Sequence, residues 1–490
     1  MRNGVQLIAY VDRFGGGDLS ALRDLLTGPL DGVFTGAHLL PFYQPHDGAD
    51  AGFDPTDHAI VDPRLGDWSD VADLAETYDL TADLIVNHIS VDSPQFRDYL
   101  ARGDESAHAG MFLSFGSVFP DGATEEELVR IYRPRPGLPF TAMTMADGSR
   151  RLMWTTFTPR QVDIDVSNVD ARAYLSRVLD LQARAGVRQV RLDAVGYAVK
   201  TPGTSCFMTD ETRRFITELG EGITARGMES LLEIHSHFTD QVQIAGLMDR
   251  VYDFALPPLV LHGLYSGSAE TLRRWLAISP RNVVTVLDTH DGIGVIDVGP
   301  AGKRPGLLSE AQIDQLVEGI HQATGGESRS ATGASASNLD LYQVNATYFS
   351  ALGCDEDRYL LSRLIQFLCP GIPQVYYAGL LAWPNDTDLL ARTGVGRDIN
   401  RPYVTRDQID AALDKRVVRR LLALIRFRNT HPAFAGEFRL GDGPANELRL
   451  GWESERGSIE ARIDLSQATF DLRHRNEGSE AMVDDWDEFG

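Results

Sequence analysis

The chain of 490 residues carries 70 acidic and 46 basic side chains, a formal charge of -24 at pH 7. A field of that sign repels nucleic acid and anionic lipid, so neither is expected as a partner. Hydrophobic residues make up 43% of the chain, which excludes global disorder. No run approaches the roughly 18 to 20 apolar residues of a membrane-spanning helix, so no membrane span is expected.

The N-terminus and the cysteines bear on the compartment. Residues 4–10 already alternate like a strand, and the basic and apolar regions of a signal peptide do not precede them. Cys206, Cys354 and Cys369 lack the C-x-x-C spacing of a zinc site, which favours reduced and mostly buried thiols. These features predict a cytoplasmic location.

Short buried apolar runs alternate with amphipathic helical segments along most of the chain. Strands are predicted at 4–10, 32–40, 83–88, 189–193, 231–235, 250–254, 283–288 and 374–377, with helices at 19–30, 68–78 and 170–185 among others. Buried β-branched runs that alternate with helices of 3.6-residue period favour a parallel sheet with helical crossovers. Eight such units predict an α/β fold, a (β/α)8 TIM barrel.

Three intervals depart from this rhythm. Residues 87–167 and 293–353 are predicted to be inserted loop domains, because they far exceed an ordinary connection between a strand and a helix. Residues 1–86, 168–292 and 354–433 are then the barrel. Residues 434–490 show short alternating runs that predict a small C-terminal β-domain, with a solvated acidic tail at 483–490.

Polar side chains stand where several predicted strands end. They are Asn87 and His88 after the third strand, Arg191 and Asp193 on the fourth, Glu233 and His235 on the fifth, and His290 and Asp291 after the seventh. Groups at the C-terminal ends of barrel strands converge on one pocket. Burying so many of them without compensation costs too much for a purely structural role, so a functional site is expected here.

Three of these side chains are carboxylates, and their spacing is not that of metal ligands. A retaining glycosidic mechanism needs an ionised nucleophile and an acid/base carboxyl about 5 to 5.5 Å apart, which neighbouring barrel strands can supply. Arg191 lies two residues before Asp193, on the same face of its strand, and is expected to hold that carboxylate ionised. The pattern favours glycosidic chemistry.

Four segments in order resemble the motif regions of the α-amylase superfamily, glycoside hydrolase family 13. They are residues 83–88, 191–195, Glu233 and 289–291. Within that superfamily, residues 47–54, 131–140, 191–197, 287–297, 336–345 and 396–401 resemble the sucrose phosphorylase family. The likeness covers about residues 1 to 430 and is sharpest in the loops, where function is set.

The resemblance implies that sucrose and inorganic phosphate give α-D-glucose 1-phosphate and fructose with retention. The implied route is a double displacement through a covalent β-glucosyl-aspartate, with transglucosylation and slow hydrolysis as side reactions. Asp193 is then the nucleophile, Glu233 the acid/base and Asp291 the stabiliser of the transition state. No organic cofactor is implied, no clustered acidic loop predicts a metal, and homodimers are frequent in the family.

The resemblance also implies which residues contact the substrate, and Arg191 and His235 are among them. His88 and His290 would hold the hydroxyls of the glucosyl unit, Asp50 and Arg401 would close the far end of its pocket, and Phe53 and Tyr197 would form an aromatic wall.

Acceptor contacts are implied on the two inserted loops. Arg135 and Tyr342 resemble phosphate contacts, and Asp340 and Gln343 resemble fructose contacts. Prolines on both sides of Arg135 restrict the backbone that presents its guanidinium. An arginine that binds phosphate in a bidentate manner explains how a strongly acidic protein recognises this anion locally.

Alternative functions stay open at this point. A phosphorylase for glucosylglycerol, glucosylglycerate or sucrose 6'-phosphate shares the core motifs, but Pro134 and Leu341 match the pattern for unphosphorylated sucrose. A plain hydrolase or transglucosylase would not need phosphate. A non-catalytic sugar-binding barrel is expected to have lost a carboxylate, and all three are present.

Overall fold

The computed structural model describes residues 1–134, 137–332, 343–476 and 479–489. Eight parallel strands close into a barrel in the order β1-β16-β13-β12-β11-β10-β5-β2. Their bounds are β1 Gln6–Ala9, β2 Gly36–Leu39, β5 Asp79–Ile85, β10 Gln189–Asp193, β11 Glu229–Leu232, β12 Arg250–Asp253, β13 Val283–Thr285 and β16 Ile372–Tyr376. Each overlaps one of the eight strands expected from the sequence, so the prediction of a (β/α)8 barrel is confirmed.

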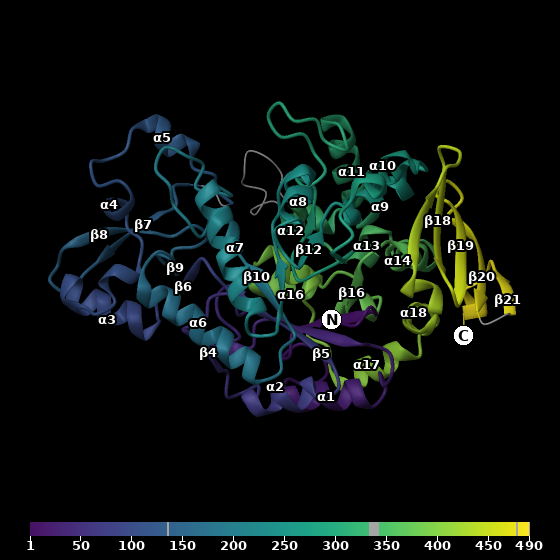
Figure 1. The fold of residues 1–490 in the computed structure, drawn as a ribbon, viewed down its shortest axis with the longest axis horizontal. Coiled ribbons are helices and arrows are strands. Elements are labelled where there is room, and N and C mark those ends of the chain that lie inside the picture. Colours follow the sequence, from purple (N-terminus) through teal and green to yellow (C-terminus); the bar gives the residue numbers. More distant parts are fainter. Residues whose placement is uncertain (135–136, 333–342, 477–478, 490) are drawn as a thin grey trace.

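Helices follow the strands and cover the outside of the barrel (Figure 1). They are α1 Leu19–Thr27, α2 Trp68–Ala75, α6 Val169–Arg184, α7 Asp210–Thr224, α8 Phe238–Ile244, α9 Leu256–Ser266, α10 Glu270–Ile278 and α14 Glu356–Leu368. Helix α6 shows why they form: the Asn168 side chain caps its N-terminus, and Tyr174 and Val178 lie on one buried face. Gly186 then takes a φ of +77°, which stops the helix.

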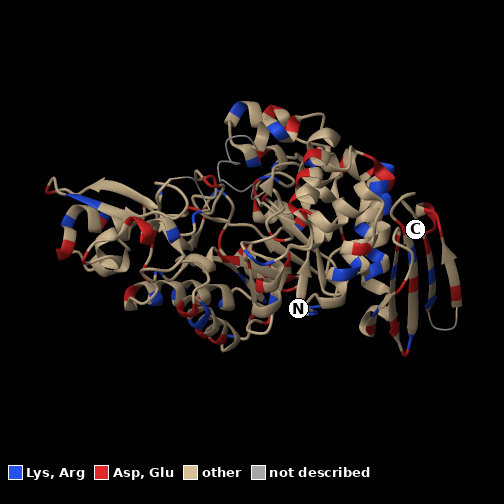
Figure 2. Ribbon diagram, turned by 90° about the horizontal axis from the view of Figure 1, so that it is seen from above, with Lys and Arg blue, Asp and Glu red and all other residues tan. Residues whose placement is uncertain are grey.

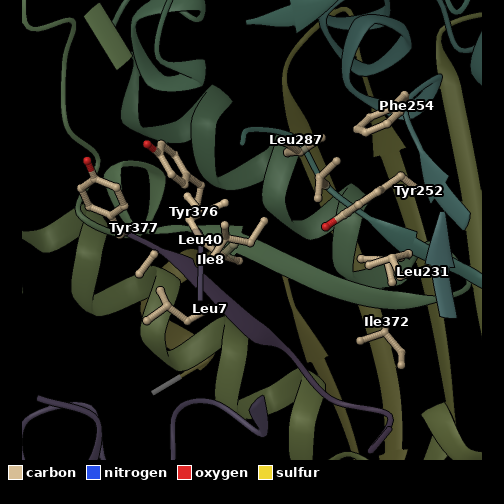
Figure 3. Packing of buried hydrophobic residues seen from close by; sticks show 14 of the residues in the cluster. Leu7, Ile8, Leu40, Leu231, Tyr252, Phe254, Leu287, Ile372, Tyr376 and Tyr377 are labelled. Atoms are coloured by element: carbon tan, nitrogen blue, oxygen red, sulfur yellow. The ribbon is translucent and has the colours of Figure 1, made fainter. Parts of the chain in front are cut away.

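The barrel interior combines apolar packing with a polar network. Figure 3 shows Leu7, Leu231 and Tyr252 among side chains that converge from different strands. Gln374 donates a hydrogen bond to Gln6 over 2.9 Å, and the Tyr252 hydroxyl donates to Gln374 over 3.2 Å. These hydrogen bonds join side chains of three strands inside the barrel and give the site a rigid base.

Between β5 and α6 the chain forms an insertion that lies at one end of the molecule (Figure 1). It contains β6 His88–Ser90, α3 Pro94–Arg102, η1 Gly103–Glu105, η2 Ala109–Met111, α4 Phe115–Val118, α5 Glu125–Arg130, β7 Phe140–Thr144, β8 Arg150–Trp154 and β9 Gln161–Asp163. Strand β6 pairs antiparallel with β9. The structure therefore differs from the prediction that His88 ends a barrel strand: β5 ends at Ile85, and His88 opens the insertion.

Two further segments rise from the same face of the barrel. Between β13 and α14 the chain forms β14 Ile293–Gly294, α11 Glu310–Ala323, α12 Glu327–Thr332, β15 Gln343–Val344 and α13 Tyr348–Ala351. Between β2 and α2 it forms an antiparallel pair, β3 Tyr43–Gln44 and β4 Asp57–Val61, which the sequence interpretation did not anticipate. The loop between β3 and β4 carries Asp50 and Phe53.

After β16 the chain completes the helical layer and then forms a separate sheet. The helical elements are α15 Tyr377–Leu380, α16 Thr387–Thr393, η4 Gly396–Asn400, α17 Arg406–Leu413, α18 Arg416–Thr430 and η5 Pro432–Ala435. The antiparallel sheet is β17 Glu437–Gly441, β18 Glu447–Ser454, β19 Gly457–Asp464, β20 Thr469–Asn476 and β21 Ser479–Val483. It lies at the opposite end of the molecule from the first insertion (Figure 1).

The acidic C-terminal tail is solvated only in part: its acidic side chains are exposed, as expected from the sequence, but Val483 and Trp486 are buried. Residues Trp486–Phe489 form a 3-10 helix, and the Trp486 side chain is buried against Phe470, with ring centroids 4.3 Å apart. Asp487 accepts a hydrogen bond from Arg420 over 2.7 Å. The tail docks because its aromatic residues bury apolar area, a gain that its acidic composition conceals.

Acidic and basic segments are interspersed along the outer helices and the C-terminal sheet (Figure 2). Among the described residues, none of the helices is both long and apolar enough to cross a bilayer.

Candidate active site

A pocket opens where the barrel strands end and the inserted segments meet. The space between its lining residues, together with the open solvent at its mouth, is about 970 Å³. Its lining includes the three carboxylates predicted to be catalytic, Asp193, Glu233 and Asp291. These come from different strands or from the loops after them, so the barrel brings together residues that are far apart in sequence.

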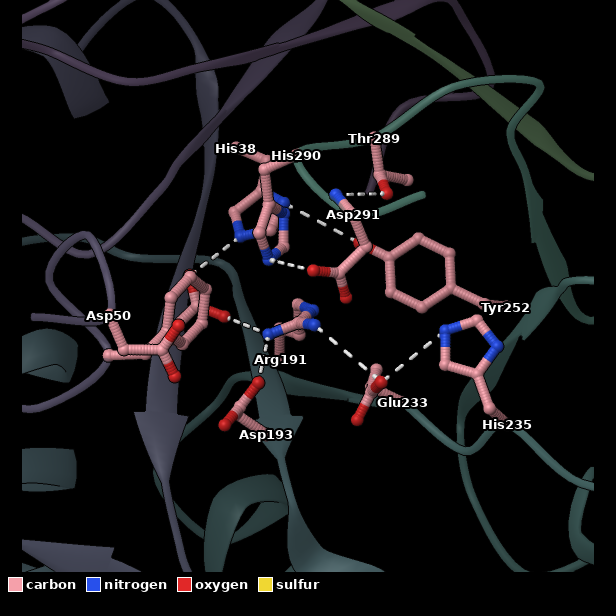
Figure 4. Close-up of polar contacts among 12 residues, drawn as sticks. His38, Asp50, Arg191, Asp193, Glu233, His235, Tyr252, Thr289, His290 and Asp291 are labelled. Carbon is pink, nitrogen blue, oxygen red and sulfur yellow. Dashed lines mark hydrogen bonds and ion pairs between the residues drawn. The ribbon is translucent and has the colours of Figure 1, made fainter. Parts of the chain in front are cut away.

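Arg191 organises the nucleophile side of the pocket. Its Nη1 lies 2.8 Å from Oδ1 of Asp193 and 2.5 Å from Oδ1 of the buried Asp83, and its Nη2 lies 4.0 Å from Oε1 of Glu233. His38 contacts the other oxygen of Asp83 over 2.9 Å. Figure 4 shows Arg191 between Asp193 and Glu233. The expected contact between Arg191 and Asp193 is present.

Neighbouring groups shift the pKa of Asp193 in opposite directions. Burial raises the pKa of this carboxyl well above its ordinary value, the negative charges of Glu233 and Asp83 add to that shift, and Arg191 counteracts it only in part. Asp83 has a lowered pKa, because Arg191 and His38 outweigh its burial. One buried guanidinium therefore serves two carboxylates, and the ionisation of Asp193 depends on it.

Two arginines and a histidine surround Asp291 on its own side of the pocket. Nη1 of Arg397 lies 2.7 Å from its Oδ1, Nη2 of Arg401 lies 3.6 Å away and Nε2 of His290 lies 3.8 Å away. Burial opposes ionisation, but Arg397, His290 and Arg401 hold the pKa of Asp291 below its usual range. Asp291 is therefore ionised whenever sugar hydroxyls approach it.

The two arginines near Asp291 occupy different places. The side chain of Arg397 is 20% exposed and lines the pocket together with Asp50. Arg401 is 2% exposed, and its Nε donates to the carbonyl oxygen of His290 over 2.7 Å. The sequence interpretation chose Arg401 as the partner of Asp50, but the side chain that reaches the pocket wall is Arg397. Both belong to the same segment, so only the fold distinguishes them.

Aromatic side chains form one wall of the pocket. Phe53 stacks on His290, with ring centroids 4.7 Å apart and planes inclined by 13°. Tyr197 and Phe157 also line the pocket and contact each other edge-to-face. Flat apolar surfaces of this kind suit the C–H faces of a sugar ring. Phe53 and Tyr197 were predicted for this role, and Phe157 was missed.

His88 is held at the junction between the first insertion and the barrel. Its Nε2 lies 3.0 Å from the carbonyl oxygen of Phe53 and 3.0 Å from Nε2 of Gln161. Gln161 also donates to Oδ2 of Asp50 over 3.2 Å. Burial lowers the pKa of His88, so the ring is neutral at pH 7. Gln161 connects two predicted contacts, and no sequence motif identified it.

Glu233 and His235 follow β11 on the opposite wall. Nε2 of His235 lies 3.7 Å from Oε1 of Glu233 and 3.5 Å from Nε2 of Gln343. Gln343 comes from β15 and also accepts from the backbone N–H of Gly292 over 3.3 Å. Among the acceptor contacts expected on the second inserted segment, Gln343 therefore lines the pocket.

Other expected acceptor residues lie outside the described part of the chain. These are Arg135, Asp340, Leu341 and Tyr342. Pro134, which precedes Arg135, lines the pocket, and so do Gln343 and Asn345 beyond the second gap. Residues from both inserted segments therefore line the site.

The buried Lys200 side chain binds three oxygen atoms beside the pocket. Nζ of Lys200 lies 2.7 Å from Oδ2 of Asp163 and 2.8 Å from Oδ1 of Asn87, and it also donates to the carbonyl oxygen of Tyr197. This buried ammonium joins the first insertion to the barrel beside the pocket wall.

Two groups of described side chains lie close enough together to be metal ligands: Glu233, His235 and Asp291 in the pocket, and His46, Asp47 and Asp62 beside Arg64. Nη2 of Arg64 lies 2.6 Å from Asp47 and 2.7 Å from Asp62. The guanidinium thus contacts both carboxylates of the second group and offsets one of their two negative charges.

Comparisons with known proteins give the family. No protein-family model matches the chain. The chain is 57% identical to the sucrose phosphorylase of Agrobacterium vitis over 468 residues, 95% of this chain and 96% of that protein. It is 53% identical to the sucrose phosphorylase of Bifidobacterium adolescentis, over 93% of this chain and 91% of that one. The glucosylglycerol phosphorylase of Marinobacter adhaerens is 37% identical over 96% of both proteins.

Solved structures agree with this relationship. A sucrose 6F-phosphate phosphorylase from Thermoanaerobacter thermosaccharolyticum superposes with a TM-score of 0.91 at 37% identity, covering 99% of this chain and 98% of that one. An α-amylase from H. orenii, at 15% identity and a TM-score of 0.66 over 95% of this chain and 90% of its own, shares the fold. With its closed barrel, its three convergent carboxylates and these relatives, the chain belongs to the sucrose phosphorylase family and is an enzyme, a phosphorylase of the glycosyltransferase type.

Proposed function

We propose that the enzyme catalyses the retaining phosphorolysis of sucrose to α-D-glucose 1-phosphate and D-fructose. The observation that carries this proposal is the arrangement of Asp193, Glu233 and Asp291 around one pocket, with Arg191 between the first two. Two sucrose phosphorylases at 57% and 53% identity support the choice of substrate. The reaction needs no redox step, and all its charge changes fall on carboxylates and their partners.

In the first half-reaction a carboxylate oxygen of Asp193 attacks the anomeric carbon of the glucosyl unit. The bond from that carbon to the fructosyl oxygen breaks, and Glu233 gives its proton to this oxygen. A β-glucosyl ester of Asp193 and free fructose result. Arg191 supports this step because it counteracts the burial that disfavours ionised Asp193.

In the second half-reaction Glu233 takes a proton from inorganic phosphate. The phosphate oxygen attacks the anomeric carbon, the ester bond to Asp193 breaks, and α-D-glucose 1-phosphate leaves. Two inversions give net retention. Asp291 strengthens its hydrogen bonds to glucose hydroxyls as positive charge develops in each transition state, and Arg397 keeps it ionised.

The glucosyl unit is assigned to the inner part of the pocket. Phe53 stacks against one face, His88 and His290 contact hydroxyls, and Asp50 with Arg397 closes the far end. Arg397 replaces Arg401 in this assignment because its side chain lines the pocket.

The acceptor is assigned to the rim. Arg135 and Tyr342 bind phosphate, and Asp340, Leu341 and Gln343 face fructose. Water or another alcohol at the same position gives slow hydrolysis or transglucosylation. A phosphorylated fructosyl unit needs additional cations, and within the described residues Arg397, already paired with Asp291, is the one arginine or lysine that lines the pocket. This observation favours unphosphorylated sucrose over sucrose 6'-phosphate.

Incubation with sucrose, with and without phosphate, tests the proposal. We expect glucose 1-phosphate and fructose in equal amounts with phosphate, and slow release of glucose without it. Parallel incubations with glucosylglycerol, glucosylglycerate and sucrose 6'-phosphate identify a different substrate if one of them is turned over faster. A cytoplasmic location and a homodimer remain predictions, which cell fractionation and light scattering test.

A further inference from the structure

A buried carboxylate outside the pocket lining, Asp297, contacts the histidine that faces the proposed acid/base. Asp297 is fully buried and follows β14, and its Oδ2 lies 3.1 Å from Nδ1 of His235. The other ring nitrogen of His235, Nε2, lies 3.7 Å from Oε1 of Glu233. Figure 4 shows the His235 ring beside Glu233. His235 therefore joins Asp297 to Glu233 through its two nitrogens.

The remaining groups of Asp297 are also engaged. Its Oδ1 accepts from the backbone N–H of Ser236 over 3.2 Å and from Nε2 of Gln241 over 3.0 Å. Its carbonyl oxygen accepts from the backbone N–H of Phe238 over 3.0 Å. Donors on several sides fix this carboxylate in position, because each would lose its partner if Asp297 turned away.

The backbone at Gly294 lies close to both Asp297 and His235. A Cβ atom on Gly294 would lie 2.7 Å from Oδ2 of Asp297 and 3.3 Å from Nδ1 of His235. The first distance is too short for ordinary packing, so a side chain at this position would displace the carboxylate. Gly294 pairs with Gln343 in the small β14–β15 ribbon, which places the pair directly beneath the acceptor side of the pocket.

The His235 ring is oriented by two contacts that act in different directions. It stacks on Phe254, with centroids 3.9 Å apart and planes inclined by 16°, which sets the plane of the ring. The bond to Asp297 sets its rotation within that plane and keeps the proton on Nδ1. A carboxylate partner of this kind fixes the tautomer and orientation of a histidine.

The charges that face His235 are Asp297, Glu233 and Asp291, and the amide of Gln343 lies nearby. Burial opposes protonation of the ring, but Asp297, Glu233 and Asp291 together raise the pKa of His235 above its ordinary value. The ring thus gains a proton on Nε2 more readily than an unpaired histidine does, and that N–H points at Glu233.

We propose that Asp297 is a positioning residue for the acid/base. By accepting the Nδ1–H of His235, it holds Nε2 of the ring toward the carboxyl of Glu233. This inference rests on the proposed role of Glu233. When Glu233 gives its proton to the fructosyl oxygen, its carboxylate gains negative charge, and the fixed N–H of His235 stabilises that charge. The benefit is largest for a leaving group that needs a full proton transfer.

Asp297→Asn tests this inference with two donors of the same glucosyl unit. The amide has nearly the shape of the carboxylate but no charge, and it permits the other tautomer of His235. We expect kcat/KM for sucrose to fall roughly 10- to 100-fold, as for other residues that orient a functional histidine. Release of fluoride from α-glucosyl fluoride should change little, because fluoride leaves with little protonation. A purely structural role lowers both rates equally and contradicts the proposal.

A readout independent of catalysis is the titration of His235, followed by NMR with labelled histidine and assigned with His235→Asn. The midpoint should move to lower pH in Asp297→Asn. Gln241→Met is the matched control, because it removes another donor of the same carboxylate and leaves the bond to His235. It should show neither the shifted midpoint nor the dependence on the leaving group.

These experiments give different results if the role of Asp297 is wrong and if the proposed function is wrong. An unchanged His235 midpoint in Asp297→Asn overturns the inference, and so does a shifted midpoint with equal losses on both donors. Failure of the proposed function appears instead as a wild-type enzyme that makes no glucose 1-phosphate from sucrose and phosphate. If Asp297→Asn does not fold, Gly294→Ala provides the second test, since its methyl group displaces the same pair and should give the same preference for the fluoride donor.

Discussion

The inner wall and the rim of the pocket are built in different ways. Asp193 and Arg191 lie on β10, a barrel strand that is hydrogen-bonded to a neighbouring strand on each side. Pro134 and Gln343 belong to the two long inserted segments and reach the pocket from outside the barrel. Strand register fixes the positions of Asp193 and Arg191 as closely as the bond-making chemistry requires. Changes in the inserted segments can alter which acceptor binds without moving these residues.

The two regions also differ in charge. On the inner wall each cation is already paired: Arg191 with Asp83 and Asp193, and Arg397 with Asp291. Paired guanidinium groups hold carboxylates ionised and have little capacity left for a phosphate. An anionic acceptor therefore needs a cation of its own at the rim, which is the role expected of Arg135.

The largest effect should come from the inner wall. Asp193→Asn replaces the carboxylate by an amide, which cannot form the glycosyl ester, so phosphorolysis and hydrolysis should both fall by about 10⁴-fold or more. Initial rates with sucrose and with α-glucosyl fluoride measure this loss, and an unchanged melting temperature serves as the control for folding. Substantial hydrolysis by the variant would contradict the assignment of the nucleophile.

Arg397→Met should give the next largest loss. It leaves Asp291 buried without its nearest cation, and breaking such a pair typically costs about 3 to 5 kcal/mol, or roughly 150- to 4000-fold. Both half-reactions should suffer, because Asp291 serves both transition states. Arg392→Met on the exposed face of α16 is the matched control. A loss confined to the phosphate step would place Arg397 at the rim instead of the inner wall.

Arg135→Ala should affect the rim alone. Loss of a desolvated charge contact costs about 2 to 5 kcal/mol, or roughly 30- to 4000-fold, and we expect it in kcat/KM for phosphate. Water needs no anion site, so the share of free glucose among the products should rise. Arg133→Ala changes a neighbouring arginine that donates to the carbonyl oxygen of Gly137, and it should leave the ratio unchanged. An unaltered product ratio in Arg135→Ala at subsaturating phosphate would falsify the assignment and point to Tyr342.

Removal of divalent metal ions should have the smallest effect. Arg64 contacts Asp47 and Asp62, and Lys200 contacts Asp163 at the first insertion, so activity should survive exhaustive treatment with a chelator. The measurement is phosphorolysis before and after dialysis against EDTA. Loss of activity that calcium restores would show that a site on the inner wall or the rim depends on metal.

Much of the inner wall was predictable because its signals are local. The alternation of buried strands with amphipathic helices gave the barrel, and polar residues at strand ends gave Asp193, Glu233 and Asp291. The rim was predictable only by resemblance, and four of its expected residues fall outside the described chain. The docked tail was misjudged, because charge composition says nothing about where Trp486 packs.

Sequence alone determined most of the polar side chains at or just after the ends of barrel strands, with His88 as an exception, since a period of two residues along a strand and a hydrophobic run that stops at a polar residue are both local patterns. Tertiary structure alone decided which groups meet across the pocket. The choice of Arg397 over Arg401, the contact of Lys200 with Asn87 and Asp163, and the bond between Asp297 and His235 all join segments distant in the chain. Such contacts depend on barrel closure and on the path of long connections, and no local pattern encodes either.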